Sequence, residues 1–523
     1  MAMAFVRLPP SSKPPPSPTE RSIDSLTPHQ HSLFGFWVAE SFSISLYQVA
    51  SSSISKGLSP GLAILALIIG HIFVAIPSML DGYVGAHLGI NFPVYCRSAF
   101  GMRGSYAAVF IRGCVAVIWF GTQSFQGGQC LNVMIQAIWP SFKRFPNRIP
   151  ESAHVTSAEL LCFFLFLIIQ APLLYVRVGT LRHMFTVKTI IMPIFGLTLF
   201  IWALVQANGF GPTFSQPTSI ADGTPVAVVF LKAVTTAIGP MATMALNMPD
   251  FTRYAKKPKE VFWTQAAGIL LFRTLCGILG VTVTSAAQVI YNVEAKEAWN
   301  PLYVTLLWNN RAAQFFAATC WGFAVIGTNI SANSVSFAND LSLWFPRYIS
   351  YRRGSFICCI LSVAAVPWYI QYSAESFSSF LGGYSLFLGA LAGILMTDFW
   401  IIRSRCLSLR ALYSASRSDT HWFWHGCNWR AGIAFICGIA PNLPGLAAAC
   451  TPDLSMPKGA VYLYSQSWLI STCIAAAVYW TLHKLAPMPV DPKEDDVIAG
   501  AGSDGEADAA SEGEKADGKA FDV

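Results

Sequence analysis

The chain has 523 residues, of which 54% are hydrophobic and 12% are charged. Soluble globular domains carry about 25% charged residues, so the composition excludes an ordinary soluble protein and indicates an integral membrane protein. The formal net charge of +7 requires no nucleic-acid partner, because basic loops on the cytoplasmic side of a membrane protein account for it.

Apolar segments recur along the chain at about 20 residues each, the length at which an α-helix crosses a bilayer. The short alternating segments of a membrane β-barrel are not present. We therefore predict an all-α polytopic membrane protein with twelve transmembrane helices, the third unusually long. The predicted spans are 34–54, 62–80, 104–139, 158–177, 183–205, 226–246, 261–290, 313–338, 355–372, 378–402, 430–449 and 461–483.

Lys and Arg residues are more frequent in the loops on the N-terminal side of the predicted membrane than in the opposite loops. The excess of basic residues marks the cytoplasmic side, so both termini are predicted to be cytoplasmic in a multi-pass plasma-membrane protein. Residues 1–31 are rich in Pro and Ser and predict a disordered segment. Residues 484–523 predict an acidic disordered tail; a contact with trafficking machinery is the alternative to a simple solvated end.

Polar residues interrupt two of the predicted spans at corresponding positions. The first span carries Glu40 and a run of serines, and the sixth contains Gly239-Pro240, which opposes a continuous helix. Taken singly, these features are explained by helix packing or a simple kink. As a pair they favour a secondary transporter built from inverted repeats, with its binding site near the middle of the membrane.

Amide side chains mark the third and eighth spans. Trp119 and Gln123 lie one helical turn apart in "WFGTQ", and Asn329 and Asn333 share a face of the eighth span. Amides donate and accept hydrogen bonds at once, which matches the edge of a heterocycle such as a pyrimidine or hydantoin. An indole can stack on the same flat ring. For Gln123 alone, the alternative is a hydrogen bond that joins two packed helices.

Enzyme, metal and channel functions find little support in the sequence. A nucleophile–base pair would need a histidine or carboxylate near the nucleophile, and the amides and hydroxyls of the polar spans have none beside them. His421 and His425 have helical spacing, but no further metal ligand accompanies them, and an interfacial loop rich in Trp and His is the favoured interpretation. No filter motif of a channel is present. We expect no metal and no cofactor.

Five motifs in order resemble the nucleobase–cation symporter-1 family, and within it the branch of fungal uracil, allantoin and uridine permeases. They are "FPVYCRSAFG", "WFGTQ", "ALNMPDFTRYAK", "GTNISANS" and "FLGGYSLFLGALAGILMTDFW". The resemblance implies a transporter domain over 32–483, with two inverted five-helix repeats at about 33–205 and 226–402. It also implies broken first and sixth helices and two extra helices at about 430–483.

The resemblance also implies roles for individual residues. Trp119 would stack on the substrate ring, while Gln123 and Asn333 would hydrogen-bond it. Asn247 and Asp250, in the signature that ends the sixth helix, would act in gating.

Two positions depart from the family pattern. Sodium-coupled members carry a Ser-Thr pair on the eighth helix, where this chain has Gly327 and Thr328, with Ala324 one turn before. Since a hard cation needs several oxygen ligands, proton coupling is favoured over sodium. Some relatives carry a second aromatic residue on the sixth helix where this chain has Met241, whose flexible thioether could still cover a ring face.

Few residues in the spans could carry a proton. Glu40 and Lys188 are the ionisable residues deepest in the apolar runs, and burial brings both kinds of group towards the working range. Lys188 has an equally good alternative, extension of its side chain to the membrane surface. In the tenth span, glycines beside Tyr384 and Phe387 are consistent with an aromatic lid or with close helix packing.

The sequence thus predicts a secondary active transporter, not an enzyme, that takes up a small heterocyclic substrate together with protons by alternating access. The predicted substrates are a nucleobase or a related ring of the uracil, allantoin, uridine or uric acid class. A permease for a vitamin or nucleoside, such as thiamine or nicotinamide riboside, is the first alternative. A multi-spanning membrane enzyme is the second.

Overall fold

The structure of the protein is a computed structural model. It describes residues 30–488 apart from 177, 221–222, 256–257, 346, 414–415, 417–419, 452–453 and 455. The predictions made for the N-terminal segment before residue 30 and for the acidic tail beyond residue 488 lie outside the described residues.

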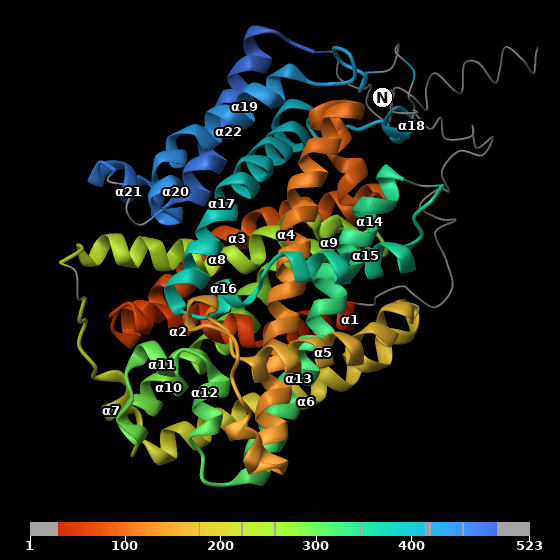
Figure 1. Ribbon diagram of the computed structural model, residues 1–523. Helices are drawn as coiled ribbons and strands as arrows, with labels where there is room; N and C mark the ends of the chain where they lie inside the picture. The colour runs from red at the N-terminus through yellow and green to blue at the C-terminus, as the bar shows by residue number, and fades with distance from the viewer. Residues whose placement is uncertain are drawn as a thin grey trace, which may run out of the picture.

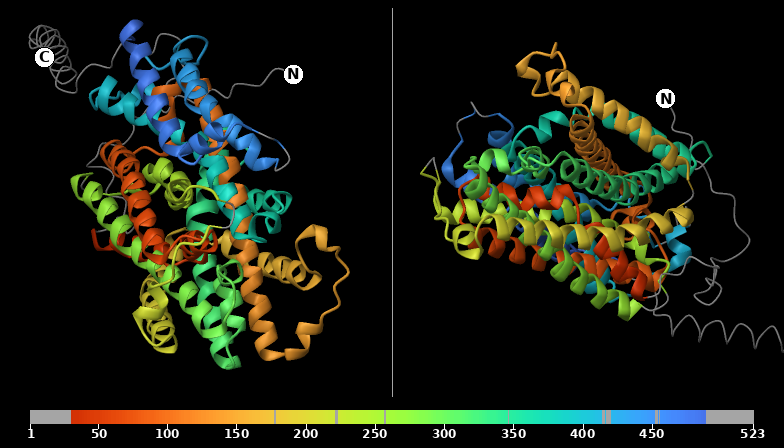
Figure 2. Two further views of the ribbon diagram at one scale, coloured as in Figure 1. Left: turned by 90° about the vertical axis from the view of Figure 1, so that its left-hand side faces the viewer. Right: turned by 90° about the horizontal axis from the view of Figure 1, so that it is seen from below.

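The described residues form a bundle of helices joined by short loops, in which the C-terminal helices group together at one end (Figures 1 and 2). The helices are α1 (Gln30–Ser41), α2 (Ile44–Ser55), α3 (Pro60–Leu88), α4 (Phe92–Ile138), η1 (Pro140–Arg144), η2 (Glu151–Ala153), α5 (Ser157–Tyr175), α6 (Val178–Gln206), α7 (Phe210–Phe214), α8 (Val226–Thr252), α9 (Pro258–Gly268), η3 (Ile269–Arg273), α10 (Thr274–Tyr291), α11 (Ala295–Ala298), α12 (Pro301–Leu306), α13 (Arg311–Thr328), η4 (Asn329–Ser334), α14 (Val335–Trp344), α15 (Tyr351–Ala364), α16 (Trp368–Gln371), α17 (Ala374–Met396), η5 (Thr397–Ile402), α18 (Leu409–Tyr413), α19 (Trp429–Ile439), η6 (Ala440–Asn442), α20 (Leu443–Cys450), α21 (Lys458–Tyr464) and α22 (Ser467–Leu485).

The helices confirm an all-α polytopic membrane protein. Within the described ranges, 9 helices are long and apolar enough to cross a membrane, and α21 with α22, bent by 83°, makes up to 10. The predicted first and ninth spans correspond instead to shorter helices, α1 with α2 and α15 with α16. The arrangement of twelve helices in two inverted repeats stays a prediction.

The predicted interruption of the first span is present. Between α1 and α2 the backbone of Ser43 is extended, with φ −143° and ψ 153°, and its hydroxyl caps α2 by accepting from the Leu46 N–H. Serine suits this position because its short hydroxyl satisfies a backbone donor that a broken helix leaves without a partner. The break therefore exposes backbone groups in the middle of the bundle.

The sixth span differs from the prediction in the place of its break. Helix α8 continues through Gly239 and Pro240, and the backbone leaves helical geometry at Asn247 instead, with φ −93° and ψ 15°. A Cβ at Gly239 would lie 2.9 Å from Leu381 Cβ, so glycine lets α17 pack directly against this turn. Pro240 removes one helical hydrogen bond, which packed membrane helices tolerate. The kink at Asn247 comes just before Pro249, a second proline in the helix.

The third span is longer than predicted because it begins at Phe92, twelve residues earlier than the apolar run suggested. Asn91 caps this start by accepting from the Val94 N–H, and a proline occupies the first turn. At Gly101 the backbone takes φ 86° and ψ 172°, which separates a short helix from the long one. Glycine is required there because φ is positive and a Cβ would lie 2.7 Å from the Gly426 carbonyl oxygen.

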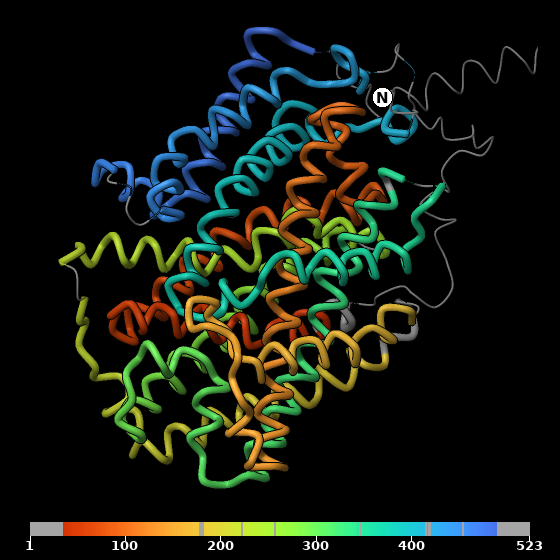
Figure 3. The backbone as a smooth tube through the Cα atoms, in the orientation of Figure 1, coloured from red at the N-terminus to blue at the C-terminus, as the bar shows by residue number. Residues whose placement is uncertain are grey.

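Helices α3 and α8 pack against each other over most of their length (Figure 3). A Cβ at Gly70 would lie 2.7 Å from Ala237 Cβ, and one at Gly85 would lie 2.4 Å from Pro249 Cα. Small residues allow this close approach, which is how membrane helices gain packing energy when lipid offers no hydrophobic driving force. The contact fixes α8, and with it the kink at Asn247, against α3.

Candidate functional site

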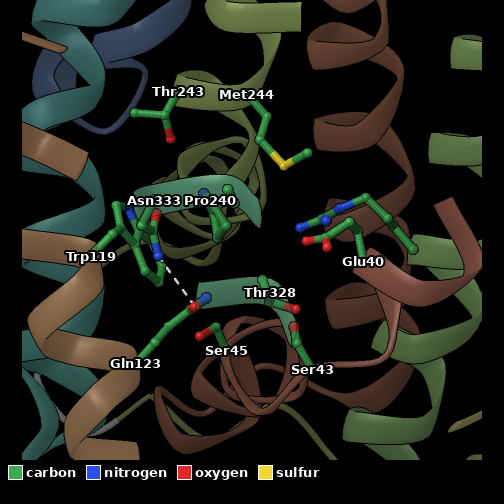
Figure 4. Close-up of a pocket in the computed structure, with 12 residues that line it drawn as sticks. Glu40, Ser43, Ser45, Trp119, Gln123, Pro240, Thr243, Met244, Thr328 and Asn333 are labelled. Carbon is green, nitrogen blue, oxygen red and sulfur yellow. Dashed lines mark hydrogen bonds between the residues drawn. The ribbon is translucent and has the colours of Figure 1, made fainter. Parts of the chain in front are cut away.

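A cavity lies where the break between α1 and α2 meets α4, α8, η3, α13 and η4. Figure 4 shows Trp119, Gln123 and Asn333 together on one side of it and Glu40 on the other. The residues that line the cavity are Glu40, Ser43, Ser45, Trp119, Gln123, Pro240, Thr243, Met244, Arg273, Thr328, Ala332 and Asn333.

Trp119 is held in place by aromatic residues of α17. Its indole N–H donates to the Tyr384 hydroxyl at 3.0 Å, and its ring meets the rings of Phe377 and Phe380 edge to face. The side chain is only 4% exposed. The hydrogen bond and the edge-to-face contacts therefore hold the indole in one orientation, which would allow its face to stack on a flat ligand.

Gln123 and Asn333 form a pair of amides across the cavity wall. The Asn333 Nδ2 donates to Gln123 Oε1 at 3.2 Å and to Asn329 Oδ1 at 3.0 Å. Among the described residues, neither Gln123 Nε2 nor Asn333 Oδ1 has a hydrogen-bond partner. One donor and one acceptor thus stay free side by side, the pattern that recognises the edge of a heterocycle.

Asn329, which we expected to contact substrate, lies behind this pair and does not line the cavity. Its Nδ2 donates to Ser124 Oγ at 3.0 Å, to Gln170 Oε1 at 3.1 Å and to the Phe120 carbonyl oxygen at 3.2 Å. These contacts anchor Asn329 to α4 and α5. From this position Asn329 can orient the Asn333 side chain through their hydrogen bond, but it does not reach a ligand in the cavity.

The methionine of the cavity is Met244 rather than Met241. Met241 is fully buried in the core of the bundle, and Met244, one turn further along α8, lines the cavity with Pro240 and Thr243. Because α8 continues as a helix through Gly239 and Pro240, the helix has no break there for Met241 to face. Its side chain packs in the core of the bundle instead.

Glu40 and Lys188 contact neighbouring residues of η4 and the end of α13. Glu40 Oε1 accepts a hydrogen bond from Ser331 Oγ at 2.7 Å, and its Oε2 has no partner among the described residues. Lys188 Nζ donates to Thr328 Oγ1 at 2.6 Å, with the side chain fully buried. The lysine therefore does not extend to the membrane surface.

Ala324 is fully buried and does not line the cavity.

Glycine at 327 makes room for the buried lysine. A Cβ there would lie 2.9 Å from Lys188 Cδ and 3.3 Å from Lys188 Nζ, so a serine at this position would displace the ammonium group. The ammonium of Lys188 thus stands beside Thr328, one of the positions where the family resemblance expects cation ligands.

The expected gating residues fall into two groups. Tyr384 contacts the cavity through Trp119, whereas Phe387 is half-buried and does not line the cavity. Asn247 and Asp250 lie outside the cavity, at the kink of α8: Asn247 is hydrogen-bonded to Ser336, and Asp250 Oδ1 accepts from the Phe92 N–H at 2.9 Å.

Arg112 links the kink of α8 to α4 and α14, a contact that the sequence did not predict. Its Nη2 lies 2.8 Å from Asp340 Oδ1 and 3.6 Å from Asp250 Oδ2, with all three side chains almost completely buried. A charged residue well inside an apolar run was the available signal.

Arg273 is the second residue that sequence reasoning missed. It is the single charged residue of the predicted span 261–290, and the structure places it in the cavity wall at the end of the π-helix η3. Single π turns within longer helices are common at functional sites.

Nothing in the described part of the chain points to a bound metal. Within it, no group of three or more His, Cys, Asp or Glu residues comes close enough to hold an ion. His421 and His425 belong to a loop, in which His425 has a φ of 51°; the helical spacing we considered does not apply.

Comparison with known proteins gives one consistent relationship. Residues 27–471 match the family model described as permease for cytosine/purines, uracil, thiamine and allantoin. The allantoin permease of Saccharomyces cerevisiae is 32% identical over 87% of this chain and 73% of that protein, and its uracil permease is 30% identical over 87% and 74%.

A solved structure supports the fold. Mhp1, a transporter of the nucleobase-cation-symport-1 family in a closed conformation with bromovinylhydantoin bound, superimposes with a TM-score of 0.68 at 20% identity, over 89% of this chain and 95% of that one. The family model and the relatives from Saccharomyces cerevisiae show that the protein is a membrane permease and not an enzyme. By the match of its sequence over most of its length, the chain belongs to the nucleobase–cation symporter-1 family.

Proposed function

We propose that this permease takes up a nucleobase or a related heterocycle, of the uracil, allantoin, uridine or uric acid class, together with protons. The observation that carries the proposal is the pairing of a fixed indole with a free amide donor and acceptor on one side of a buried cavity. Trp119 would cover the face of a flat ring, and Gln123 and Asn333 would form hydrogen bonds with the polar atoms at its edge.

The position of the cavity supports alternating access. It lies at the break between α1 and α2, where backbone groups free of helical bonds are available, and beside α8 and η4. Substrate sites of secondary transporters are formed by interrupted helices of this kind near the middle of the membrane. Movement of the helices around the break would then open the cavity to one side at a time.

Buried Lys188 supports a proton as the coupling ion. Its ammonium group contacts Thr328 at 2.6 Å, and Gly327 leaves the space that it fills. A fixed positive charge there competes with a sodium ion for the same oxygen. Loss of a proton from Lys188, or its transfer to Glu40, would give the site two charge states that transport can alternate between.

We further propose that the protein lies in the plasma membrane with both termini cytoplasmic, following the distribution of basic loops. The acidic tail would then be available to trafficking machinery. Labelling of single cysteines introduced into the loops, in intact and in permeabilised cells, tests the orientation. Labelling of the N-terminal segment in intact cells would reverse it.

Uptake measurements test the function directly. Radiolabelled uracil, allantoin, uridine and uric acid are supplied to a permease-deficient host expressing the protein, with and without a protonophore and with and without sodium. We expect at least one ring to accumulate, accumulation to collapse with protonophore, and sodium to have no effect. Accumulation that survives the protonophore but requires sodium contradicts proton coupling.

Failure of all four rings to accumulate would reject the substrate class, and thiamine and nicotinamide riboside would be assayed next. The variant Lys188→Met keeps an unbranched side chain, one heavy atom shorter, and removes the charge. We expect it to bind substrate while losing protonophore-sensitive accumulation. Full accumulation by this variant would remove Lys188 from the coupling mechanism.

A further inference from the structure

Arg273 presents a charged group to the cavity that the protein itself does not neutralise by direct contact. The side chain is 4% exposed and lines the cavity that also contains Glu40 and Trp119. Its Nε has no hydrogen-bond partner among the described residues. The ion pairs of the described residues do not include it.

A guanidinium group in this position is costly unless something pairs with it. Removing an ion from water costs several kcal/mol, and good hydrogen bonds to an opposite charge are needed to offset this. Two other buried arginines of the bundle have a carboxylate partner. Arg403 contacts Asp398 at 2.9 Å and Arg112 contacts Asp340 at 2.8 Å. Arg273 has none in the described residues, and it faces the space that a ligand would occupy.

While Lys188 is protonated, the charges around the cavity leave one positive charge in excess. Glu40 and Arg273 are the charged residues among those that line it. Lys188 adds a second cation directly behind the wall, through its contact with the lining residue Thr328. Two cations therefore face one carboxylate, and that carboxylate already accepts a hydrogen bond from Ser331.

We propose that Arg273 contacts the substrate and selects, within the heterocycles of the proposed function, rings that carry one negative charge. The planar guanidinium fork matches the two oxygens of a carboxylate, or one oxygen and the adjacent nitrogen of a deprotonated imide. The inference rests on the proposed function, since the ring must first enter this cavity. It adds a charge preference that Trp119, Gln123 and Asn333, all uncharged, do not impose.

A pair of ligands with nearly the same shape but different charge tests the proposal. Binding of uracil-6-carboxylate and of its neutral carboxamide is measured on the purified, detergent-solubilised protein, with uracil as the reference ring. A charge-assisted hydrogen bond contributes about 1.5–3 kcal/mol, so we expect the carboxylate to bind about tenfold or more tightly than the carboxamide. Equal binding of the two, or tighter binding of the carboxamide, overturns the proposal.

Two substitutions locate the preference. Arg273→Gln should reduce the carboxylate-to-carboxamide ratio to about one, because the amide still donates but carries no charge. Arg273→Lys should keep a reduced preference, because the charge remains but the fork is lost. Arg144→Gln, at an exposed position between α4 and α5, is the matched control and should leave the ratio unchanged. An unchanged ratio in Arg273→Gln overturns the proposal.

The design separates this inference from the proposed function. If the protein accumulates uracil or allantoin but does not distinguish the carboxylate from the neutral carboxamide, the proposed function is retained and the proposed role of Arg273 is rejected. If it neither accumulates nor binds any ring, both fall. If Arg273→Gln fails to fold, the wild-type ligand pair and the Arg273→Lys variant still decide the question.

Discussion

Two buried polar networks of this protein differ in how completely the protein satisfies them. At the end of α17, Asp398 is fully engaged: Arg403 Nε donates to Oδ2 at 2.9 Å and the Tyr479 hydroxyl donates to Oδ1 at 2.8 Å. In the cavity, Glu40 Oε2 and Arg273 Nε have no partner among the described residues. Buried polar groups are costly when unpaired. The first network therefore serves structure, whereas the second leaves polar groups free for the proposed substrate and coupling ion.

The network around Asp398 ties the C-terminal helices to the rest of the bundle. Arg403 also donates to the Ser98 carbonyl oxygen at 2.9 Å, and Asn428 Nδ2 donates to the Ala99 carbonyl oxygen at 2.7 Å. Ser98 and Ala99 precede the turn of α4 at Gly101, whose backbone leaves carbonyls free of helical bonds. The side chains of α22, the loop before α19 and η5 thus meet at one turn of α4.

The largest effect is expected from breaking this network. Asp398→Ala leaves Arg403 buried without its carboxylate, and loss of one partner of a buried ion pair costs about 3–5 kcal/mol. The yield of monodisperse protein and its melting temperature in detergent should both fall strongly. Asp398→Asn is the milder control, since it keeps the shape and one acceptor. A melting temperature equal to wild type in Asp398→Ala would show that the network does not stabilise the fold.

In the cavity, by contrast, a substitution should lower transport and leave the fold intact. Gln123→Ala removes the acceptor of Asn333 and the free donor beside it. Loss of the ligand contact of Gln123 and of the hydrogen bond that orients Asn333, at about 1 kcal/mol each, predicts uptake at least about tenfold below wild type at low substrate concentration. Initial uptake rates are normalised to surface expression.

The matched control for this variant is Gln136→Ala on the same helix, whose side chain donates to Asn132 and does not line the cavity. It should transport like wild type. Normal uptake by Gln123→Ala would remove the amide pair from the binding site, and with it the main support for the proposed function.

A smaller effect is expected from Trp119→Phe. The substitution keeps an aromatic face and loses the N–H that donates to Tyr384 at 3.0 Å. A neutral hydrogen bond contributes about 1 kcal/mol, so the apparent substrate affinity should fall about fivefold while maximal uptake is retained. Trp119→Ala removes the face as well and should weaken binding further. Equal affinities for the two variants would show that the indole does not stack on the substrate.

The sequence predicted the parts of this structure that depend on local pattern. Spans of apolar residues predicted the long helices, and the serines near Glu40 predicted the break at Ser43. The position of the second break was wrong, because Gly239 and Pro240 are held in a helix by packing against Leu381 that no local pattern reveals.

Burial and direction of side chains were harder to predict for the same reason. Met241 and Met244 are both apolar residues of one helix, and only the packing of α8 decides which of them faces the cavity. Asn329 was assigned to the ligand because its chemistry matches that of Asn333, and the contacts that turn it towards α4 and α5 come from other spans. Arg273 is a single charged residue in an apolar span, and this feature of the sequence indicated a residue of the functional site.

The smallest effect is expected from an ion pair that resembles the others in chemistry but not in burial. Lys232 and Glu375 lie 3.7 Å apart, with 35% and 77% of their side chains exposed. Water and salt screen such pairs, which contribute about 0–1 kcal/mol. Glu375→Gln should therefore change the melting temperature by far less than Asp398→Ala and leave uptake within about twofold of wild type. Since all these pairs join a basic to an acidic side chain, a loss of stability as large as that of Asp398→Ala would mean that burial does not decide which charges hold the bundle together.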